Sequence, residues 1–139
     1  MLFASLLGVA RANPTSIEVV PASLEQFPGD SFIVNVTVSD VTDLYLWMFR
    51  LRWNKTVLLL NSIQEGPFLK EAGMTSSLVL LPSTTSAIND AGRMEEVTCG
   101  LMGDVQGVNG SGTIATLNFT CLSMGNTSLE FWEENPHFE

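Results

Sequence analysis

The residue types that carry most enzyme chemistry are scarce in this sequence. His137 is the only histidine among 139 residues, and it lies next to the C-terminal end. Nucleophilic triads need an imidazole beside the nucleophile, and most zinc sites use at least one. The sequence therefore gives no support to a triad or to a histidine-based metal site.

Carboxylates are the remaining candidates for chemistry. Two acids can catalyse glycoside hydrolysis, but they need a pocket that holds the substrate between them. The acids closest to such a pattern fall in predicted turns or strand edges, where acids are usually solvated: Asp90, Glu95, Glu96 and Asp104. Asp40, Asp43 and Asp104 could offer oxygens to calcium, but they lack EF-hand spacing. We predict a non-catalytic protein with no metal or cofactor of its own.

The composition is that of one acidic globular domain. Fifteen acids against six bases give a net charge of −9, and charged residues make up 15% of the chain, below the roughly 25% that is typical. This charge would repel nucleic acid. A chain of this length can bury a single core without metals or several disulfides.

The first residues are typical of a secretory signal. An apolar run from Leu2 to Val9 precedes Ala10-Arg11-Ala12, a small-residue pattern that favours cleavage after Ala12. The basic n-region is missing, so residues 1–12 read as an incomplete signal. A buried first strand is the alternative, although Ala, Gly and Ser are poor strand formers.

Five Asn-x-Ser/Thr sequons agree with export, although such triplets also arise by chance in a chain rich in Asn and Thr. Their asparagines are Asn35, Asn54, Asn109, Asn118 and Asn126.

Short alternating segments separated by turn residues run through the rest of the chain, at the spacing of a β-sandwich. Pro21 interrupts the first segment, which favours an edge strand. A helical period is absent, apart from a turn or two near Phe68 to Ala72. We predict an all-β domain over residues 13–134 and a frayed or truncated tail over residues 135–139.

The segment from Asp43 to Asn54 has two unlike faces if it forms a strand. One face is apolar and suits a core: Tyr45, Trp47, Phe49, Leu51 and Trp53. The other mixes apolar and basic side chains: Leu46, Met48, Arg50 and Arg52. This second face is neither a core pattern nor an ordinary solvated surface.

The two cysteines, Cys99 and Cys121, allow two interpretations. Export would favour a disulfide, but both residues fall on the core phase of their strands, where free buried cysteines are common.

The order of the segments resembles a cohesin domain, and more closely the cohesin-like domains of archaeal exported proteins. The resemblance covers about Ser16 to Trp132. The stretches that carry it are "PGDSFIVNVTVSDV", "RWNKTVLLLNSIQEGPFL" and "AGRMEEVTCGLMGDVQGVNGSGTIATLNFTC". It implies a nine-stranded β-sandwich of jelly-roll topology, a fold shared with carbohydrate-binding modules.

The resemblance also implies a partner. Cohesins bind dockerins, which are calcium-loaded helical modules, through one flat sheet face, and the calcium belongs to the dockerin. Cellulosomal cohesins place polar contacts near the positions of Leu46 and Met48, so this chain departs from them there. In this topology the segment from Asp43 to Asn54 would lie between the strands of Cys99 and Cys121, which puts them about 9.5 Å apart. That spacing is too wide for a disulfide, so we favour two free thiols.

We therefore expect a protein-binding face on this sheet, formed by Leu46, Met48, Arg50, Arg52, Thr98, Gly100, Met102, Ile114, Thr116 and Asn118. Carbohydrate binding is the alternative, with only Trp132 and Phe68 left for an aromatic platform, and a purely structural surface domain is a third. As an alternative for the arginines, they could pair with Glu95 or Glu96. A glycan on Asn118 would obstruct the expected face.

Overall fold

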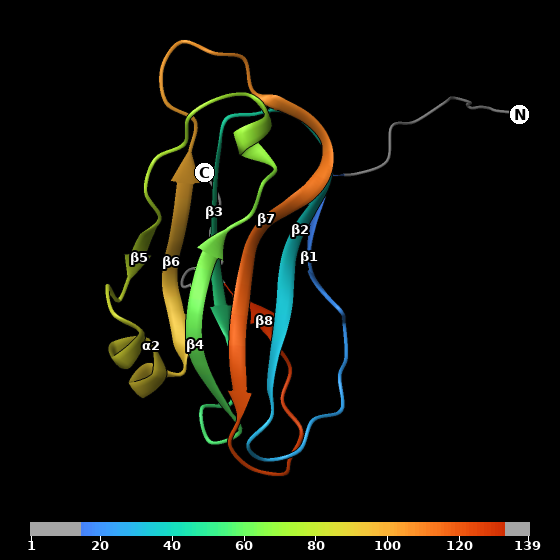
Figure 1. The fold of residues 1–139 in the computed structure, drawn as a ribbon, viewed down its shortest axis with the longest axis vertical. Coiled ribbons are helices and arrows are strands. Elements are labelled where there is room, and N and C mark those ends of the chain that lie inside the picture. Colours follow the sequence, from blue (N-terminus) through green and yellow to red (C-terminus); the bar gives the residue numbers. More distant parts are fainter. Residues whose placement is uncertain (1–14, 133–139) are drawn as a thin grey trace, which may run out of the picture.

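Two antiparallel sheets pack face to face in the computed structural model, which describes residues 15–132. Figure 1 shows them as two layers. The first, named here the β7 sheet, has the order β1 (Ser16–Val20), β2 (Ser31–Leu44), β7 (Val108–Cys121), β4 (Leu58–Glu65). The second, the β3 sheet, has the order β5 (Val79–Leu81), β6 (Arg93–Gly100), β3 (Leu46–Arg52), β8 (Glu130–Phe131).

The predicted all-β sandwich is confirmed, with eight strands over the described residues rather than nine. The strand before Pro21 is an edge strand, as predicted. The predicted signal over residues 1–12, the tail over residues 135–139 and His137 lie outside the described residues. No helix within residues 15–132 is long and apolar enough to cross a membrane.

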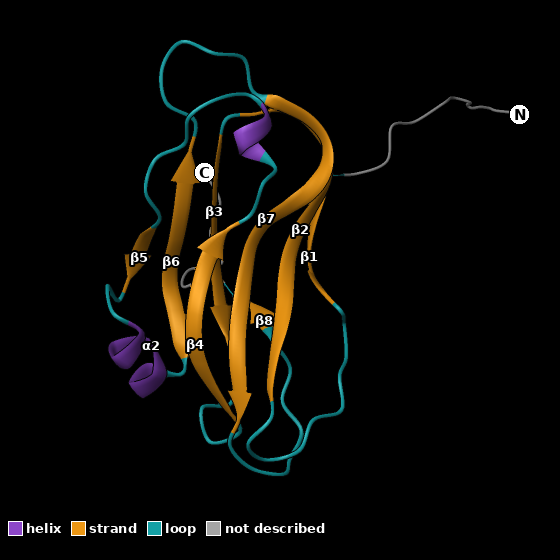
Figure 2. Ribbon diagram, in the orientation of Figure 1, coloured by secondary structure: helices purple, strands orange, loops and turns teal. Residues whose placement is uncertain are grey.

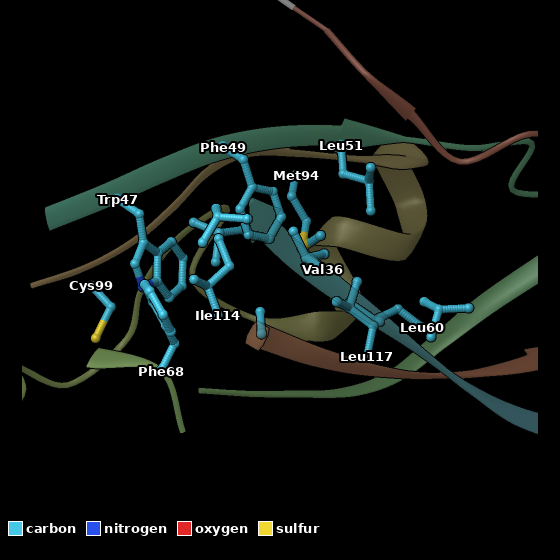
Figure 3. Close-up of a cluster of buried hydrophobic side chains, with 14 of the residues drawn as sticks. Val36, Trp47, Phe49, Leu51, Leu60, Phe68, Met94, Cys99, Ile114 and Leu117 are labelled. Atoms are coloured by element: carbon cyan, nitrogen blue, oxygen red, sulfur yellow. The ribbon is translucent and has the colours of Figure 1, made fainter. Parts of the chain in front are cut away.

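The core fills the space between the sheets with side chains from alternate strand positions. Trp47, Phe49 and Leu51 of β3 point toward Val36 and Leu117 of the β7 sheet, as Figure 3 shows. All five are at most 5% exposed. Strict alternation over β3 therefore follows from one of its faces being buried.

A bulge in β7 changes this alternation at one position. Val36 lies opposite Ala115, whereas the next residue, Thr37, lies opposite Thr113. Ile114 has no partner on β2, and its side chain is 1% exposed. An extra residue of this kind re-aims a side chain, so Ile114 belongs to the core and not to the outer face for which it was predicted.

Two short helices connect strands (Figure 2). The helical turn at Leu69–Glu71 was predicted, but the α-helix α2 (Thr85–Ala91) was not. The Thr84 hydroxyl accepts a hydrogen bond from Ala87 N at its start, and Gly92 ends it with φ 73°. These are an N-cap and a left-handed glycine C-cap, the two signals that could have identified the helix.

The α2 helix also closes the outer edge of β4. The Asn89 side chain accepts a hydrogen bond from Leu60 N (2.7 Å) and donates one to Leu60 O (2.9 Å). It thereby imitates a neighbouring strand, and Ile88 anchors the helix in the core with no exposed surface. Because Leu60 is 1% exposed, its backbone groups could not rely on water instead.

Candidate functional site

The outer face of β3 is the surface on which we expected a partner to bind. Leu46 is 58% exposed and Met48 is 46% exposed, while Arg50 is half-buried and Arg52 exposed. Each points away from the core because its neighbours Trp47, Phe49 and Leu51 point into it. The predicted two-faced strand is confirmed.

Tyr45 was expected on the core face, and this was wrong. It lies between β2 and β3 and is 37% exposed. Its hydroxyl donates a hydrogen bond to the Gly103 carbonyl, and its own carbonyl accepts from Leu101 N (2.8 Å). The chain crosses from one sheet to the other here, so the strand alternation does not extend to this residue.

Neighbouring strands extend the apolar surface in register. Met48 lies opposite Thr98, and Thr98 lies opposite Val79 of β5 on its other side. The large apolar side chains on this outer face are about half-exposed, and together they define the apolar patch: Leu46, Met48, Val79, Leu81 and Met102. Sequence reasoning missed Val79 and Leu81, although the short alternating stretch "LVLL" could have indicated them.

A basic aromatic corner borders this patch. The Trp132 ring centroid lies 5.9 Å from the guanidinium carbon of Arg50 and 5.2 Å from that of Arg93. Both distances are within the range of cation–π attraction. Trp132 N also donates to Arg50 O (3.2 Å), which holds the tryptophan beside β3.

The arginines of this corner differ in their partners. Arg52 pairs with Glu130 (3.3 Å), and Arg93 pairs with Glu95 (3.7 Å). The Ser128 hydroxyl and then Arg52 lower the pKa of Glu130. Arg50 donates to the backbone oxygen of Glu95 (2.9 Å), and within residues 15–132 no carboxylate lies within 4.0 Å of its charge. The alternative that the arginines pair with Glu95 or Glu96 thus holds for neither β3 arginine.

Two further residues of the expected face, Thr116 and Asn118, lie elsewhere. They belong to β7, which is in the opposite sheet from β3. The Thr116 hydroxyl donates to Asn35, and Asn118 accepts from Asn61 on β4. The prediction placed β3 beside β7, whereas β3 lies between β6 and β8. A glycan on Asn118 would therefore leave the apolar patch unobstructed.

Cys99 and Cys121 are both free and buried. The two thiols were predicted, but the geometric premise was wrong, since they lie in opposite sheets and not two strands apart in one sheet. Burial raises the pKa of the Cys99 thiol, and Glu65 adds to this while a hydrogen bond with Ser76 opposes it. Because both thiols are buried, neither has the exposure that a reactive cysteine needs.

The acids gather at no metal site among the described residues. The Asp43 carboxylate instead accepts a hydrogen bond from Gly107 N (2.8 Å), and Asp43 itself has φ 54°. Its role is to hold a turn. Phe68 is 2% exposed, so it cannot belong to an aromatic platform for sugars.

Comparison with known proteins agrees with this architecture. The model of the cohesin domain family matches residues 17–139, and the chain belongs to that family. A sequence search of characterised proteins finds no significant match.

Solved cohesins share the fold at low identity. A type I cohesin of Clostridium thermocellum, solved in a cohesin–dockerin complex, is 12% identical with a TM-score of 0.64, over 86% of this chain and 82% of that one. The sixth cohesin of scaffoldin B from Acetivibrio cellulolyticus, solved with a dockerin, is 17% identical with a TM-score of 0.61, over 87% and 83%. A non-cellulosomal cohesin from the archaeon Archaeoglobus fulgidus is 15% identical with a TM-score of 0.58, over 87% and 79%.

Proposed function

We propose that this chain is a non-catalytic protein-binding module that docks a dockerin-type partner on the outer face of the β3 sheet. The observation that carries the proposal is the apolar patch, whose side chains come from β3, from the edge strand β5 and from Met102 just after β6. Dockerin partners in the solved complexes of related cohesins support the choice of partner class.

The patch has the chemistry of an interface core. Exposed apolar side chains that gather on one face mark association sites, and methionine and arginine are enriched in such interfaces. Burying a fully exposed side chain of this size contributes about 1.5–3 kcal/mol, and because Leu46 and Met48 are already about half-covered, each would contribute about half of that. We therefore expect the apolar surface that docking buries to supply more of the affinity than charge does.

The basic corner would supply orientation. Arg50 is half-buried and has no carboxylate partner among residues 15–132, so a carboxylate of the docked protein could approach it in a partly dehydrated setting, where an ion pair is stronger than in water. Arg52 and Arg93 already have carboxylate partners. Arg50 is therefore the charge we expect to select among partners.

The setting we propose is exported: the module would attach other proteins to a scaffold or to the cell surface, and degradation of polysaccharides is one such use. Calcium would be needed by the partner and not by this chain.

A pull-down with the full chain tests the proposal. The exported proteins of the source organism are incubated with the immobilised chain, with and without a calcium chelator. Capture of a dockerin-type protein only when calcium is present supports the proposal. Retention on insoluble polysaccharide without any protein partner would favour the carbohydrate-binding alternative and overturn it.

A further inference from the structure

The five sequon asparagines differ from the other asparagines within residues 15–132 in the hydrogen bonding of their side-chain amides. In four of them the side-chain oxygen accepts a hydrogen bond: Asn35, Asn54, Asn109 and Asn118. Within residues 15–132, the side-chain amide nitrogen of none of the five donates one. That nitrogen is the atom to which an N-linked sugar is attached.

The two described asparagines outside sequons behave differently. Asn61 uses its amide nitrogen to reach Asn118 Oδ1 and Thr120 Oγ1, both at 2.8 Å. Asn89 uses its nitrogen to reach Leu60 O. Both of these asparagines thus engage the amide nitrogen, whereas the five sequon asparagines leave the nitrogen free of hydrogen bonds to residues 15–132.

Asn54 shows the local geometry most clearly. Its Oδ1 accepts hydrogen bonds from Thr56 N (3.0 Å) and from Thr56 Oγ1 (2.6 Å). This is an Asx-turn in which the hydroxyl of the sequon threonine binds the amide oxygen. Asn54 is exposed, and these contacts engage its oxygen while its amide nitrogen has no hydrogen bond to residues 15–132.

The sequons are also distributed unevenly over the molecule. Asn54 and Asn126 lie in the loops after β3 and β7, and they are near each other because Asn54 N donates to Thr127 Oγ1 (2.8 Å). Asn109 lies near the start of β7, and Asn35 and Asn118 lie on the outer face of the β7 sheet, on the adjacent strands β2 and β7. No sequon asparagine lies on any of the four strands of the β3 sheet, β5, β6, β3 or β8.

We propose that these asparagines accept N-linked glycans, so that the modified protein carries sugar on the β7 sheet and at the strand ends and keeps the β3 sheet bare. In this step a bond forms between Asn Nδ2 and the anomeric carbon of a lipid-phosphate-linked oligosaccharide. The bond from that carbon to the phosphate oxygen breaks, the phosphate leaves with the electron pair, and the amide loses one proton. No oxidation or reduction is involved.

The proposal does not depend on the docking function, because it concerns only the asparagine nitrogens that would receive the sugar. If both hold, the sugar covers the surfaces that docking does not use.

Mass spectrometry of the full chain from the exported fraction of its own cells tests the proposal. We expect an intact mass above that of the polypeptide, with sugar on peptides that contain Asn54, Asn109 and Asn126, on at least one of Asn35 and Asn118, and on neither Asn61 nor Asn89. An unmodified intact mass overturns the proposal. Sugar confined to the strand ends overturns its assignment of the β7 sheet.

Hydroxyl variants show that the sequon geometry is responsible. Thr56→Ala should remove sugar from Asn54 alone, whereas Thr56→Ser should retain it. Because Thr56 is an exposed turn residue, both variants should fold. Equal occupancy of Asn54 in the two variants would contradict the assignment.

Discussion

Leu46 lies directly opposite Gly100 in the β3–β6 ladder and covers it. A Cβ added at Gly100 would lie 3.2 Å from Leu46 Cδ1 and 3.4 Å from Tyr45 O. The glycine therefore gives Leu46 room to lie flat within the apolar patch. Gly100→Ala should push Leu46 outward and weaken partner binding by about threefold to tenfold, or roughly 0.7–1.4 kcal/mol.

The same substitution should leave folding nearly unchanged. Alanine lowers the conformational entropy of the unfolded chain and offsets the small clash, so the free energy of unfolding should change by less than about 1 kcal/mol. Titration calorimetry with the partner and urea denaturation measure the two effects. Unaltered affinity would show that Leu46 does not contact the partner.

Reversing the character of the β3 face should abolish docking. The double variant Met48→Asp with Arg50→Glu replaces an exposed apolar group, and a cation without a carboxylate partner within residues 15–132, by two acids. Neither side chain belongs to the core, but Arg50→Glu also removes the hydrogen bond to Glu95 O and the contact with the Trp132 ring. The free energy of unfolding should therefore fall by only about 1–2 kcal/mol, while the affinity falls at least a hundredfold, about 2.7 kcal/mol.

Ile33 provides the matched control. It is 54% exposed, and it lies opposite Asn118 on the outer face of the β7 sheet. Ile33→Asp adds the same single negative charge as the single variant Met48→Asp, at a similarly exposed apolar position on the opposite face. Met48→Asp alone should weaken binding, whereas Ile33→Asp should bind the partner normally. If Ile33→Asp lost the partner and Met48→Asp kept it, the docking face would have to be reassigned to the β7 sheet.

Asn89 should matter for stability because it completes the edge of β4. Asn89→Ala removes both hydrogen bonds to Leu60 and leaves a buried N–H without a partner, which costs about 1–3 kcal/mol. Asn61→Ala is the control, since it removes two exposed hydrogen bonds and should cost less than about 0.5 kcal/mol. Urea denaturation that ranks the two variants in the opposite order would contradict the role of Asn89.

The fold and the inward face of β3 could be predicted because they depend on local periodicity. A strand buried on one face must alternate, and Trp47, Phe49 and Leu51 show this directly. The outward direction of Leu46 and Met48 follows from the same rule. The resemblance to cohesins indicated that the sheet with Leu46 and Met48 is the one that binds a partner.

The composition of the face could not be predicted, because it depends on which strands pair. Alternation does not reveal whether β7 lies beside β3 or in the opposite sheet, so Thr116 and Asn118 were placed with the wrong neighbours. Ile114 was predicted on the wrong face because it is itself the extra residue of the bulge, and alternation alone does not reveal a bulge. Gly100, the last residue of β6, lies beside Leu46 of β3 as predicted, and Met102 follows it two residues later.

Cys99 should make stability depend on alkaline pH. Burial raises its pKa in the folded protein above the ordinary value of 9.0, so above pH 9 the unfolded chain loses the thiol proton before the folded chain does. The free energy of unfolding should therefore fall as the pH rises from 9.0 toward the folded pKa, by at most about 1.4 kcal/mol per pH unit. Cys99→Ala lacks this contribution, and its other titrating groups are unchanged. Urea denaturation of both proteins between pH 7 and pH 10 measures this effect. The difference between their free energies of unfolding should be constant below pH 8 and should shrink above pH 9. A constant difference over the whole range would mean that the folded thiol ionises as easily as the unfolded one.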